Sequence, residues 1–516
     1  MNIRIVFVAA LLGLALAQWA RAEPVQPAEL SLTARCRVPI EGPKGQYRVV
    51  EKALRWDGKK TALVICDVWD KHWCNGANVR LGAMLERMNR TVEAARAAGA
   101  LIIHAPSDCM DFYKDTPQRK LATSAPPAKN IPAEIAEWCS KLKGEPADPI
   151  DSSDGGCDDQ PQCKQGRAWK SEHPAIRIAD NDAVSDKGVE VWNLLESRGI
   201  ENVMILGVHT NMCISGRPFG LRNLSRYGKN VVLIRDLTDT MYNPRKTPQV
   251  AHERGTALFV EHVEKYICPT VLSSDLLGDA RPAHVLLVIG EDEYSMAETL
   301  PEFAKSELDK LGIRCTFAIA DAKRDRNDFG AIERAKDVDL LVIGTRRRTP
   351  TVAQLDFVRQ HLAAGKPLIG IRTASHGFAA KPPDAQHASW DSFDRDVFGE
   401  KYEGHFGSSK AKNPPVAVSP AEGASGHPIL AGWPKEDVKF SSTLYKSHEL
   451  ATTTTVLLYG AIDTPQGREP VAWTNTYKGG RIFYTSLGSA DDFADPAYRR
   501  MLRNAVLWAL ERAIPD

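Results

Sequence analysis

Short apolar runs alternate with helix-like stretches along most of this chain, and this alternation constrains the fold more than any other feature of the sequence. Strands that alternate with helices build βαβ units, which form parallel sheets covered on both faces. In the first half, strands are predicted at residues 61–66, 101–104, 176–178, 202–207 and 230–234. Helices are predicted at residues 79–98 and 188–198, and another should follow Cys213.

The alternation stops near residue 272 and resumes near residue 284. The stretch 272–282 lacks apolar periodicity and contains Gly278 and Pro282, which is typical of a linker. A chain of 516 residues is also too long for one core, because a domain usually holds about 100–200 residues. We therefore predict two doubly wound, mainly parallel three-layer α/β/α domains, at residues 31–271 and 283–516. The strands expected in the second domain are residues 284–290, 315–319, 339–344 and 367–371, and its helices are 298–311 and 351–364.

Composition and charge exclude two broad classes of protein. Hydrophobic residues make up 43% of the chain and charged residues 25%, which is the balance of a folded protein rather than of a disordered one. The 66 basic and 65 acidic residues leave a net charge of +1, whereas a nucleic-acid-binding protein normally shows a basic excess or stripe. We therefore expect no nucleic-acid partner.

The N-terminal residues have the pattern of an export signal. Arg4 supplies a positive charge, residues 5–17 are almost entirely apolar, and Ala20-Arg21-Ala22 gives the small-x-small cleavage pattern. The alternative is a membrane anchor, but the apolar run is shorter than the roughly 20 residues that a span needs. We therefore expect a signal peptide at residues 1–22, export to the periplasm or the medium, and no membrane partner after cleavage.

Ten cysteines in so long a chain are too dilute for a disulfide scaffold. In an oxidising compartment, Cys157 and Cys163 are the best candidates for a pair, because they lie close together in one polar insert. Two free surface thiols are the alternative, and the sequence leaves both open.

An acid, a base and a thiol follow strands that should share one sheet. In open parallel sheets, functional groups gather beyond the carboxyl ends of the strands. Asp67 follows the first strand, Arg177 lies at the third, and Cys213 follows the fourth, where a helix should begin. A thiol at a helix start is expected to have a lowered pKa, and the backbone N–H groups there can hold an oxyanion. Asp67 would then take the thiol proton, and a cation would orient its carboxylate.

Residues 62–67 resemble the strand and aspartate that open the isochorismatase-like cysteine hydrolases, a superfamily that includes the nicotinamidases. Residues 207–213 resemble the nucleophile turn of that family, and residues 231–236 resemble its next strand and aspartate. The resemblance covers roughly residues 55–270. It implies that Asp67 and Cys213 are catalytic, and that the peptide before His209 is cis and helps to form an oxyanion site.

The third catalytic residue of the family is usually a lysine, and the matching segment here, residues 175–183, contains none. Arg177 is the best match to that position, and Lys170 in the preceding polar stretch is the alternative. Arginine keeps the positive charge but does not exchange protons, so Arg177 would hold geometry only.

Aromatic and histidine side chains near these strand ends are expected to line a substrate pocket. Trp69, Trp73, His72 and His104 are the candidates, with core packing as the alternative for the tryptophans. Nicotinamidases hold a metal near this loop with an aspartate and histidines, but Pro106-Ser107-Asp108 follows His104 where that pattern would need a ligand. We therefore expect no cofactor, and a divalent metal in the first domain is the alternative.

The second half resembles the trehalose-utilisation (ThuA-like) family, whose fold is that of class I glutamine amidotransferases. The matches lie at residues 289–294, 298–301, 366–371, 398–405, 479–488 and 504–509. The turn at residues 371–377 lacks the cysteine of an amidotransferase, so thiol catalysis is not expected here. Arg372, His376, His405 and Tyr445 would form a polar pocket for a sugar-like ligand, or a site that has lost its function.

Together these features predict an exported cysteine hydrolase that cleaves an amide or a related C–N bond of a small-molecule substrate. The second domain would serve binding or assembly. The alternative is a non-catalytic ligand-binding or scaffold protein that retains both folds. Substrate identity and homo-oligomerisation are left open by the sequence.

Overall fold

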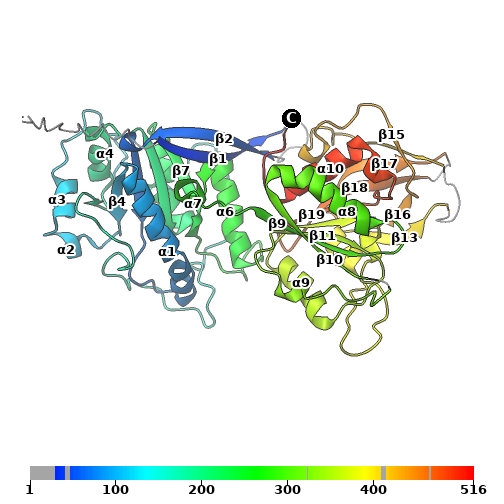
Figure 1. Ribbon diagram of the computed structural model, residues 1–516. Helices are drawn as coiled ribbons and strands as arrows, with labels where there is room; N and C mark the ends of the chain where they lie inside the picture. The colour runs from blue at the N-terminus through cyan, green and yellow to red at the C-terminus, as the bar shows by residue number, and fades with distance from the viewer. Residues whose placement is uncertain (1–28, 41–46, 322, 408–413, 464–466, 516) are drawn as a thin grey trace, which may run out of the picture.

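The computed structural model describes residues 29–40, 47–321, 323–407, 414–463 and 467–515. Two α/β units lie side by side, each built on its own large sheet (Figure 1). The expected signal peptide at residues 1–22 lies outside the described residues. Among the helices in the described ranges, none is both long enough and apolar enough to cross a membrane.

The first sheet has eight strands in the order β2-β1-β8-β7-β6-β3-β4-β5. Its strands are β1 (Glu29–Pro39), β2 (Tyr47–Asp57), β3 (Thr61–Cys66), β4 (Leu101–Ala105), β5 (Ala183–Val184), β6 (Asn202–Val208), β7 (Asn230–Asp239) and β8 (Thr270–Val271). Strands β3 to β8 pair in parallel, and only the β1–β2 hairpin runs antiparallel to its neighbours. The first sheet is therefore mainly parallel, as predicted.

Helices cover both faces of this sheet because its central strands are apolar on both sides. The helices are α1 (Asn75–Ala97), α2 (Met110–Tyr113), α3 (Pro117–Thr123), α4 (Gly188–Ser197), α5 (Leu221–Arg226), α6 (His252–Tyr266) and α7 (Ser273–Leu277). Ala62 and Val64 of β3 pack with α4, α5 and α6, whereas Leu63 and Ile65 pack with α1. This is the predicted three-layer arrangement.

The register of the central strands brings their carboxyl ends to one edge. Cys66 at the end of β3 lies opposite Ala105 of β4 and Gly207 of β6. Gly207 has φ 118°, and a Cβ there would lie 2.0 Å from the carbonyl oxygen of Cys66. Only glycine fits this close approach, which is needed for β6 to end beside β3.

Three local features differ from what the sequence led us to expect. Residues 176–178 form turns and irregular backbone instead of a strand, and the edge position is taken by the short β5. The stretch expected to be a linker contains α7, whose Ser273 Oγ donates a hydrogen bond to Asp236 at 2.5 Å. The β1–β2 hairpin was not expected, although the alternating burial of β1 has the period of a half-buried strand.

The second sheet has nine strands in the order β10-β9-β11-β12-β19-β18-β17-β14-β15, and β13 pairs with β16 separately. The strands are β9 (Ala283–Gly290), β10 (Ile313–Ile319), β11 (Leu340–Thr345), β12 (Leu368–Ile371), β13 (Lys401–His405), β14 (Val416–Pro420), β15 (Val438–Phe440), β16 (Tyr445–His448), β17 (Thr455–Ala461), β18 (Arg468–Tyr477) and β19 (Gly480–Thr485). From β10 to β19 the sheet is parallel, and from β19 to β15 it is antiparallel. The second sheet is therefore mixed.

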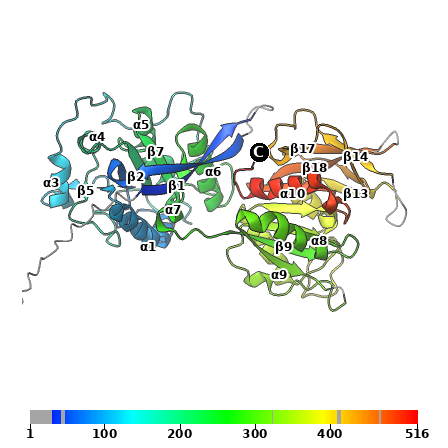
Figure 2. The same ribbon diagram turned by 45° about the horizontal axis from the view of Figure 1, so that its top comes forward.

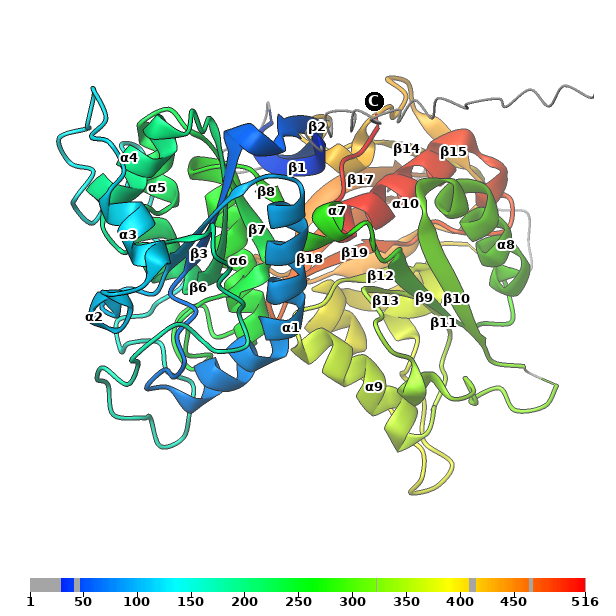
Figure 3. The same cartoon turned by 60° about the vertical axis from the view of Figure 1, so that its left-hand side comes forward.

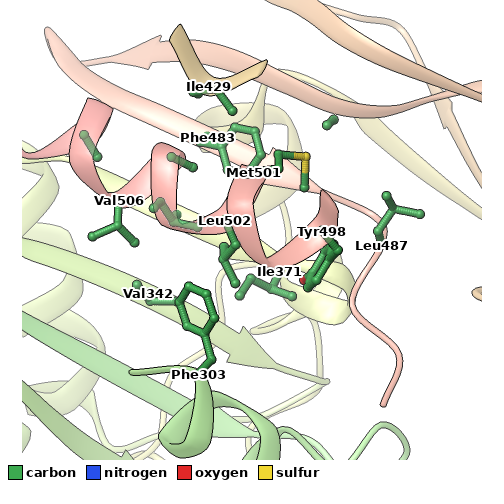
Figure 4. Close-up of a cluster of buried hydrophobic side chains, with 14 of the residues drawn as sticks. Phe303, Val342, Ile371, Ile429, Phe483, Leu487, Tyr498, Met501, Leu502 and Val506 are labelled. Atoms are coloured by element: carbon green, nitrogen blue, oxygen red, sulfur yellow. The ribbon is translucent and has the colours of Figure 1, made fainter. Parts of the chain in front are cut away.

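Helices α8 (Met296–Phe303) and α10 (Pro496–Ala509) cover one face of the second sheet, and α9 (Val352–Ala363) covers the other (Figure 3). Asp495 caps α10 by accepting from the backbone N–H groups of Ala497 and Tyr498. The buried face of α10 has helical spacing and packs on the sheet, as Figure 4 shows for Tyr498, Met501, Leu502 and Val506. The α/β/α class predicted for this half is confirmed.

The hairpin also joins the two units (Figure 2). Arg37 of β1 donates from Nε to Glu264 of α6 at 2.8 Å and from Nη2 to Glu511 at 2.7 Å. Glu511 follows α10, near the C-terminal end of the chain, and also lies 3.4 Å from Arg481 of β19. Although burial raises the pKa of the Glu511 carboxyl, these guanidinium groups hold it well below its usual range.

Candidate active site

Three side chains meet at the carboxyl edge of the first sheet. Asp67 directly follows β3, and Cys213 lies on a π-helical turn, η2 (Thr210–Ile214), that follows β6. Arg217 lies just beyond this turn and donates from Nε to Asp67 Oδ2 at 3.1 Å. The Cys213 thiol lies close enough to the Asp67 carboxylate for each group to shift the pKa of the other. The structure therefore brings the predicted acid and thiol together with a cation.

The Asp67 side chain is held from several directions. Its backbone has φ 52°, a left-handed conformation that is unusual for a residue other than glycine, and its N–H donates to the Ala105 carbonyl at 3.1 Å. Its Oδ1 accepts from the backbone N–H of Ser107 at 2.8 Å, while Oδ2 faces Arg217. Asp67 is fully buried, so these contacts fix the carboxylate in one orientation.

The turn that carries Cys213 is closed by a hydrogen bond from the Ile214 N–H to the His209 carbonyl at 3.1 Å. The peptide between Val208 and His209 is cis, as the family resemblance implies. The His209 backbone lies close enough to the Cys213 sulfur to favour its thiolate. A backbone donor therefore stands beside the atom that would attack a substrate, where an oxyanion can be stabilised.

Burial raises the pKa of both Asp67 and Cys213. For Asp67, burial outweighs the lowering by Arg217 and by the contacts with Cys213 and Ser107. For Cys213, burial and the Asp67 charge outweigh the lowering by Arg217 and the His209 amide. The expectation of a lowered thiol pKa is therefore wrong, because the donors of the turn are weaker than burial beside a carboxylate. Two such neighbours cannot both be charged easily, because each negative charge disfavours the other.

Arg177 does not supply the cation of this site. Its side chain is exposed, and its backbone N–H donates to Asn89 at the side of α1, at 2.9 Å. Lys170, the alternative, is also exposed, and its backbone N–H donates to Asp70 at 2.9 Å. The cation beside Asp67 is Arg217, which the sequence analysis missed.

A signal for Arg217 was present in the sequence. It lies four residues after Cys213, and its backbone N–H donates to the Cys213 carbonyl at 3.0 Å, so both belong to one helical turn. Residues four apart on a helix point the same way, which places a cation on the nucleophile's face. Its guanidinium also lies 5.6 Å from the centre of the Trp138 ring.

Stacked aromatic rings lie next to these three residues. Trp69 stacks on Trp169 with ring centres 4.1 Å apart, and His72 is parallel to Trp169 at 6.0 Å. His72 also contacts Trp73 and lies 4.9 Å from His209. Burial lowers the pKa of His72 to about 4 and that of His209 to about 3, so both are neutral near pH 7. These rings pack together beside the thiol, and Trp169 joins them. Trp69 is buried in this cluster, which agrees with the core-packing alternative, and pocket lining stays a prediction.

His104 was expected to line the pocket, but it is fully buried inside β4. Its Nδ1 lies 2.7 Å from Glu172 and its Nε2 lies 3.1 Å from Asp182. Both ring nitrogens are therefore occupied, which leaves no nitrogen for a metal or a substrate. Burial works against a charged ring, but the two carboxylates raise the pKa of His104 to about 9.

This buried pair predicts how stability depends on pH. A histidine with a raised pKa stabilises the fold below its ordinary value of 6.5, and this contribution disappears as pH rises through about 9. We expect the free energy of unfolding to fall by on the order of 3 kcal/mol over that range, as measured by urea denaturation. Glu172→Gln removes a partner of His104 and should flatten the curve. An equal pH dependence in both proteins would contradict this assignment.

The four residues predicted for the second pocket also come together. Arg372 and His376 belong to the turn η6 (Arg372–His376) at the carboxyl end of β12, and Tyr445 begins β16. Arg372 lies over the Tyr445 ring at 4.9 Å, and its Nη2 donates to Thr443 at 2.8 Å. His376 and His405 each lie 6.2 Å from the Tyr445 ring centre.

Two tyrosines complete this second cluster. Tyr294 lies 4.1 Å from the Arg372 guanidinium, and Tyr402 stacks on His376 at 4.4 Å. Burial and the nearby arginines lower the pKa of His376 to about 3, so its ring is neutral near pH 7. The cluster combines a buried cation with several aromatic faces and lacks a thiol, which suits binding better than covalent catalysis.

Comparison with protein families gives one match for each half of the chain. Residues 61–261, from β3 into α6, match the family described as isochorismatase domain. Residues 284–509, from β9 to the end of α10, match the family described as trehalose utilisation (ThuA). No curated protein matches the chain.

Three solved structures illustrate the similarity. A putative ThuA-like protein from Parabacteroides merdae is 14% identical, with a TM-score of 0.36, over 46% of this chain and 93% of its own. A cysteine hydrolase from Pseudomonas syringae pv. phaseolicola is 12% identical, with a TM-score of 0.28, over 44% of this chain and 95% of its own. An isochorismatase family protein from Burkholderia thailandensis is 16% identical, with a TM-score of 0.25, over 43% and 97%.

Proposed function

Because the chain joins an isochorismatase-like cysteine hydrolase domain to a ThuA-like domain, we propose that it hydrolyses an amide or related C–N bond of a small molecule. The observation that carries this proposal is the contact between the Cys213 thiol and the buried Asp67 carboxylate, which also faces Arg217 at 3.1 Å. A thiol, a base and an orienting cation are the groups that nucleophilic catalysis needs.

The reaction would begin with transfer of the thiol proton. Asp67 takes the proton from Cys213 Sγ as the sulfur attacks the substrate carbonyl carbon, and the carbonyl oxygen becomes an oxyanion. Backbone N–H groups at His209 and Cys213 would stabilise that oxyanion. Asp67 then gives its proton to the leaving nitrogen, the C–N bond breaks, and a thioester remains on Cys213. Water hydrolyses the thioester with Asp67 again as base, which restores the thiol and releases the acid.

Arg217 keeps Asp67 in place through these steps and does not exchange protons itself. The layered rings of Trp69, Trp169 and His72 offer flat apolar faces beside the thiol. Flat substrates stack well on such faces, which favours an amide attached to a planar or aromatic group.

Activity on a panel of small amides tests the proposal, using residues 23–516 as the mature chain. We expect wild type to release amine or ammonia from at least one planar amide, and Cys213→Ala to be at least about 10³-fold slower. Cys109→Ala is the matched control, because Cys109 belongs to the same buried cluster while its thiol donates to the Ser107 carbonyl. A Cys213→Ala variant as active as wild type would contradict the proposed nucleophile.

The second domain is proposed to bind a sugar-like ligand or to serve assembly. Arg372 and the rings around it could hold hydroxyl groups and stack on a sugar face. We further propose that the protein is exported, on the strength of residues 1–22, and that the periplasm or the medium is where it meets its substrate.

A further inference from the structure

A second group of reactive side chains converges outside the contacts of Asp67, Arg217 and Cys213. Three cysteine sulfurs surround one oxygen, Oδ2 of Asp159, and the distances are 3.3 Å from Cys74, 3.4 Å from Cys157 and 3.2 Å from Cys163. Cys74 immediately precedes α1, whereas the other three residues belong to one loop. All three cysteines are free thiols.

Hydrogen bonding alone accounts poorly for this arrangement. The same oxygen of Asp159 also accepts from the Gly76 N–H at 3.1 Å, so four donors point at one carboxylate oxygen. A carboxylate oxygen has about two lone-pair sites, and a thiol is a weak donor.

The sulfur–oxygen distances match those between neighbouring ligands of a tetrahedral metal ion. Zinc–sulfur bonds of about 2.3 Å and zinc–oxygen bonds of about 2.0 Å place neighbouring sulfur and oxygen ligands about 3.5 Å apart. The three sulfur–oxygen distances lie between 3.2 and 3.4 Å, and the ligand atoms of Cys74, Cys157 and Asp159 all lie within 4.8 Å of one another. The Cys163 sulfur is within reach of Asp159 but not within 4.8 Å of all three, so it has to move toward the other sulfurs to complete a tetrahedron. Three thiolates with one carboxylate are a soft, closed set that suits zinc better than magnesium or calcium.

We propose that Cys74, Cys157, Cys163 and Asp159 form a structural site for a tetrahedral divalent metal, with Zn²⁺ as its preferred ion. Binding would release the thiol protons and replace the three thiol hydrogen bonds to Asp159 by four metal–ligand bonds. It would also link the loop to Cys74, which precedes α1 and lies two residues after His72.

Ion pairs and hydrogen bonds hold the loop that carries three of these ligands. Asp158 forms an ion pair with Arg80 of α1 at 2.7 Å, and Arg80 also contacts Asp239 at 3.0 Å. Asp154 accepts from the Gly156 N–H at 3.0 Å and from Asn243 at 2.7 Å. Partners of this kind orient the ligands of a metal and tune its affinity.

A disulfide is the competing explanation, but it uses only two of the three sulfurs. A second group with metal-like spacing, Glu145, Asp148 and His262, differs in a decisive way. Arg222 donates to Glu145 at 2.6 Å, so a resident cation already occupies that position. Around Asp159, Arg80 pairs with the Asp158 carboxylate and Arg245 donates to the backbone carbonyls of Asp158 and Asp159, so neither arginine contacts the Asp159 carboxylate.

Metal content of the mature chain, residues 23–516, tests the proposal without any activity measurement. The protein is purified under reducing conditions, loaded with Zn²⁺, desalted and analysed by mass spectrometry for bound metal. We expect about one zinc per chain, and at least about 100-fold weaker binding in Cys163→Ser and in Asp159→Asn. Cys315→Ser, which changes a half-buried cysteine of the second domain, should bind zinc like wild type.

Loading with Co²⁺ gives a second readout. Thiolate-bound tetrahedral cobalt should produce a charge-transfer band and intense visible bands, which Cys163→Ser should weaken or remove. Absence of stoichiometric zinc in the reduced protein, or full zinc binding by Asp159→Asn and Cys163→Ser alike, would overturn the proposal. A Cys157–Cys163 disulfide that forms in preference to zinc binding would overturn it too.

Discussion

Asp67→Asn is expected to lower turnover by at least about 10²-fold while making Cys213 more reactive toward iodoacetamide at neutral pH. The substitution removes the base, so substrate attack loses its proton acceptor. It also removes the negative charge that, after burial, does most to raise the pKa of the Cys213 thiol. Arg217 stays beside the sulfur, and its charge then favours the thiolate.

The measurement is the pH profile of alkylation, read peptide by peptide with mass spectrometry. The midpoint for Cys213 should move to lower pH in Asp67→Asn, while Cys315, a half-buried thiol of the second domain whose pKa is raised by burial and by Asp309, keeps its profile. If Asp67 only positions the turn, turnover and alkylation will fall together. That outcome would remove Asp67 from the role of base.

Arg217→Ala should lower turnover by about 10²- to 10³-fold, because the catalytic carboxylate of Asp67 loses the positive charge that orients it. Arg217→Lys keeps the charge but not the Nε–H that donates to Asp67, so it should recover only part of the activity. Arg177→Ala and Lys170→Ala are the matched controls, since both side chains are exposed. Each control should stay within about a factor of two of wild type.

Thermal unfolding of the four variants separates catalysis from folding. Arg217 is about one-fifth exposed, and removing its pair with the buried Asp67 costs some stability. Loss of activity in a variant that remains folded at the assay temperature supports the assignment. Normal turnover in Arg217→Ala, or a large loss of turnover in Arg177→Ala, would contradict the assignment of Arg217 and would favour Arg177 as the orienting cation.

Asp67 and Cys213 could be found from sequence because each directly follows an apolar strand, and parallel strands bring such positions to one edge. Arg217 was missed because the search followed strand ends, whereas this cation lies on the same helical turn as the thiol. The pKa of Cys213 was misjudged for a different reason. A helix start is visible in sequence, but the depth of burial beside a carboxylate depends on the packed structure.

The two sheets were predictable because their central strands are short apolar runs. For example, β3 spans residues 61–66, the same residues that the sequence predicts. The structure of the polar stretch between β4 and β5 could not be predicted. This stretch has little periodicity, and its contacts join residues far apart in the chain. Cys74 and Cys157 meet only after α1, β4 and that long stretch have folded back on one another. Sequence spacing alone carries no signal for such a meeting.

The bridge between β1 and Glu511 bears on how these two domains are inherited. Arg37 is almost completely buried, and one of its partners, Glu511, lies 474 residues further along the chain. A recombination event that exchanged the second domain would leave this guanidinium facing a foreign surface and short of one counter-charge. We therefore expect descendants of this fusion to lose or keep the two halves together, and to change Arg37 and Glu511 in step.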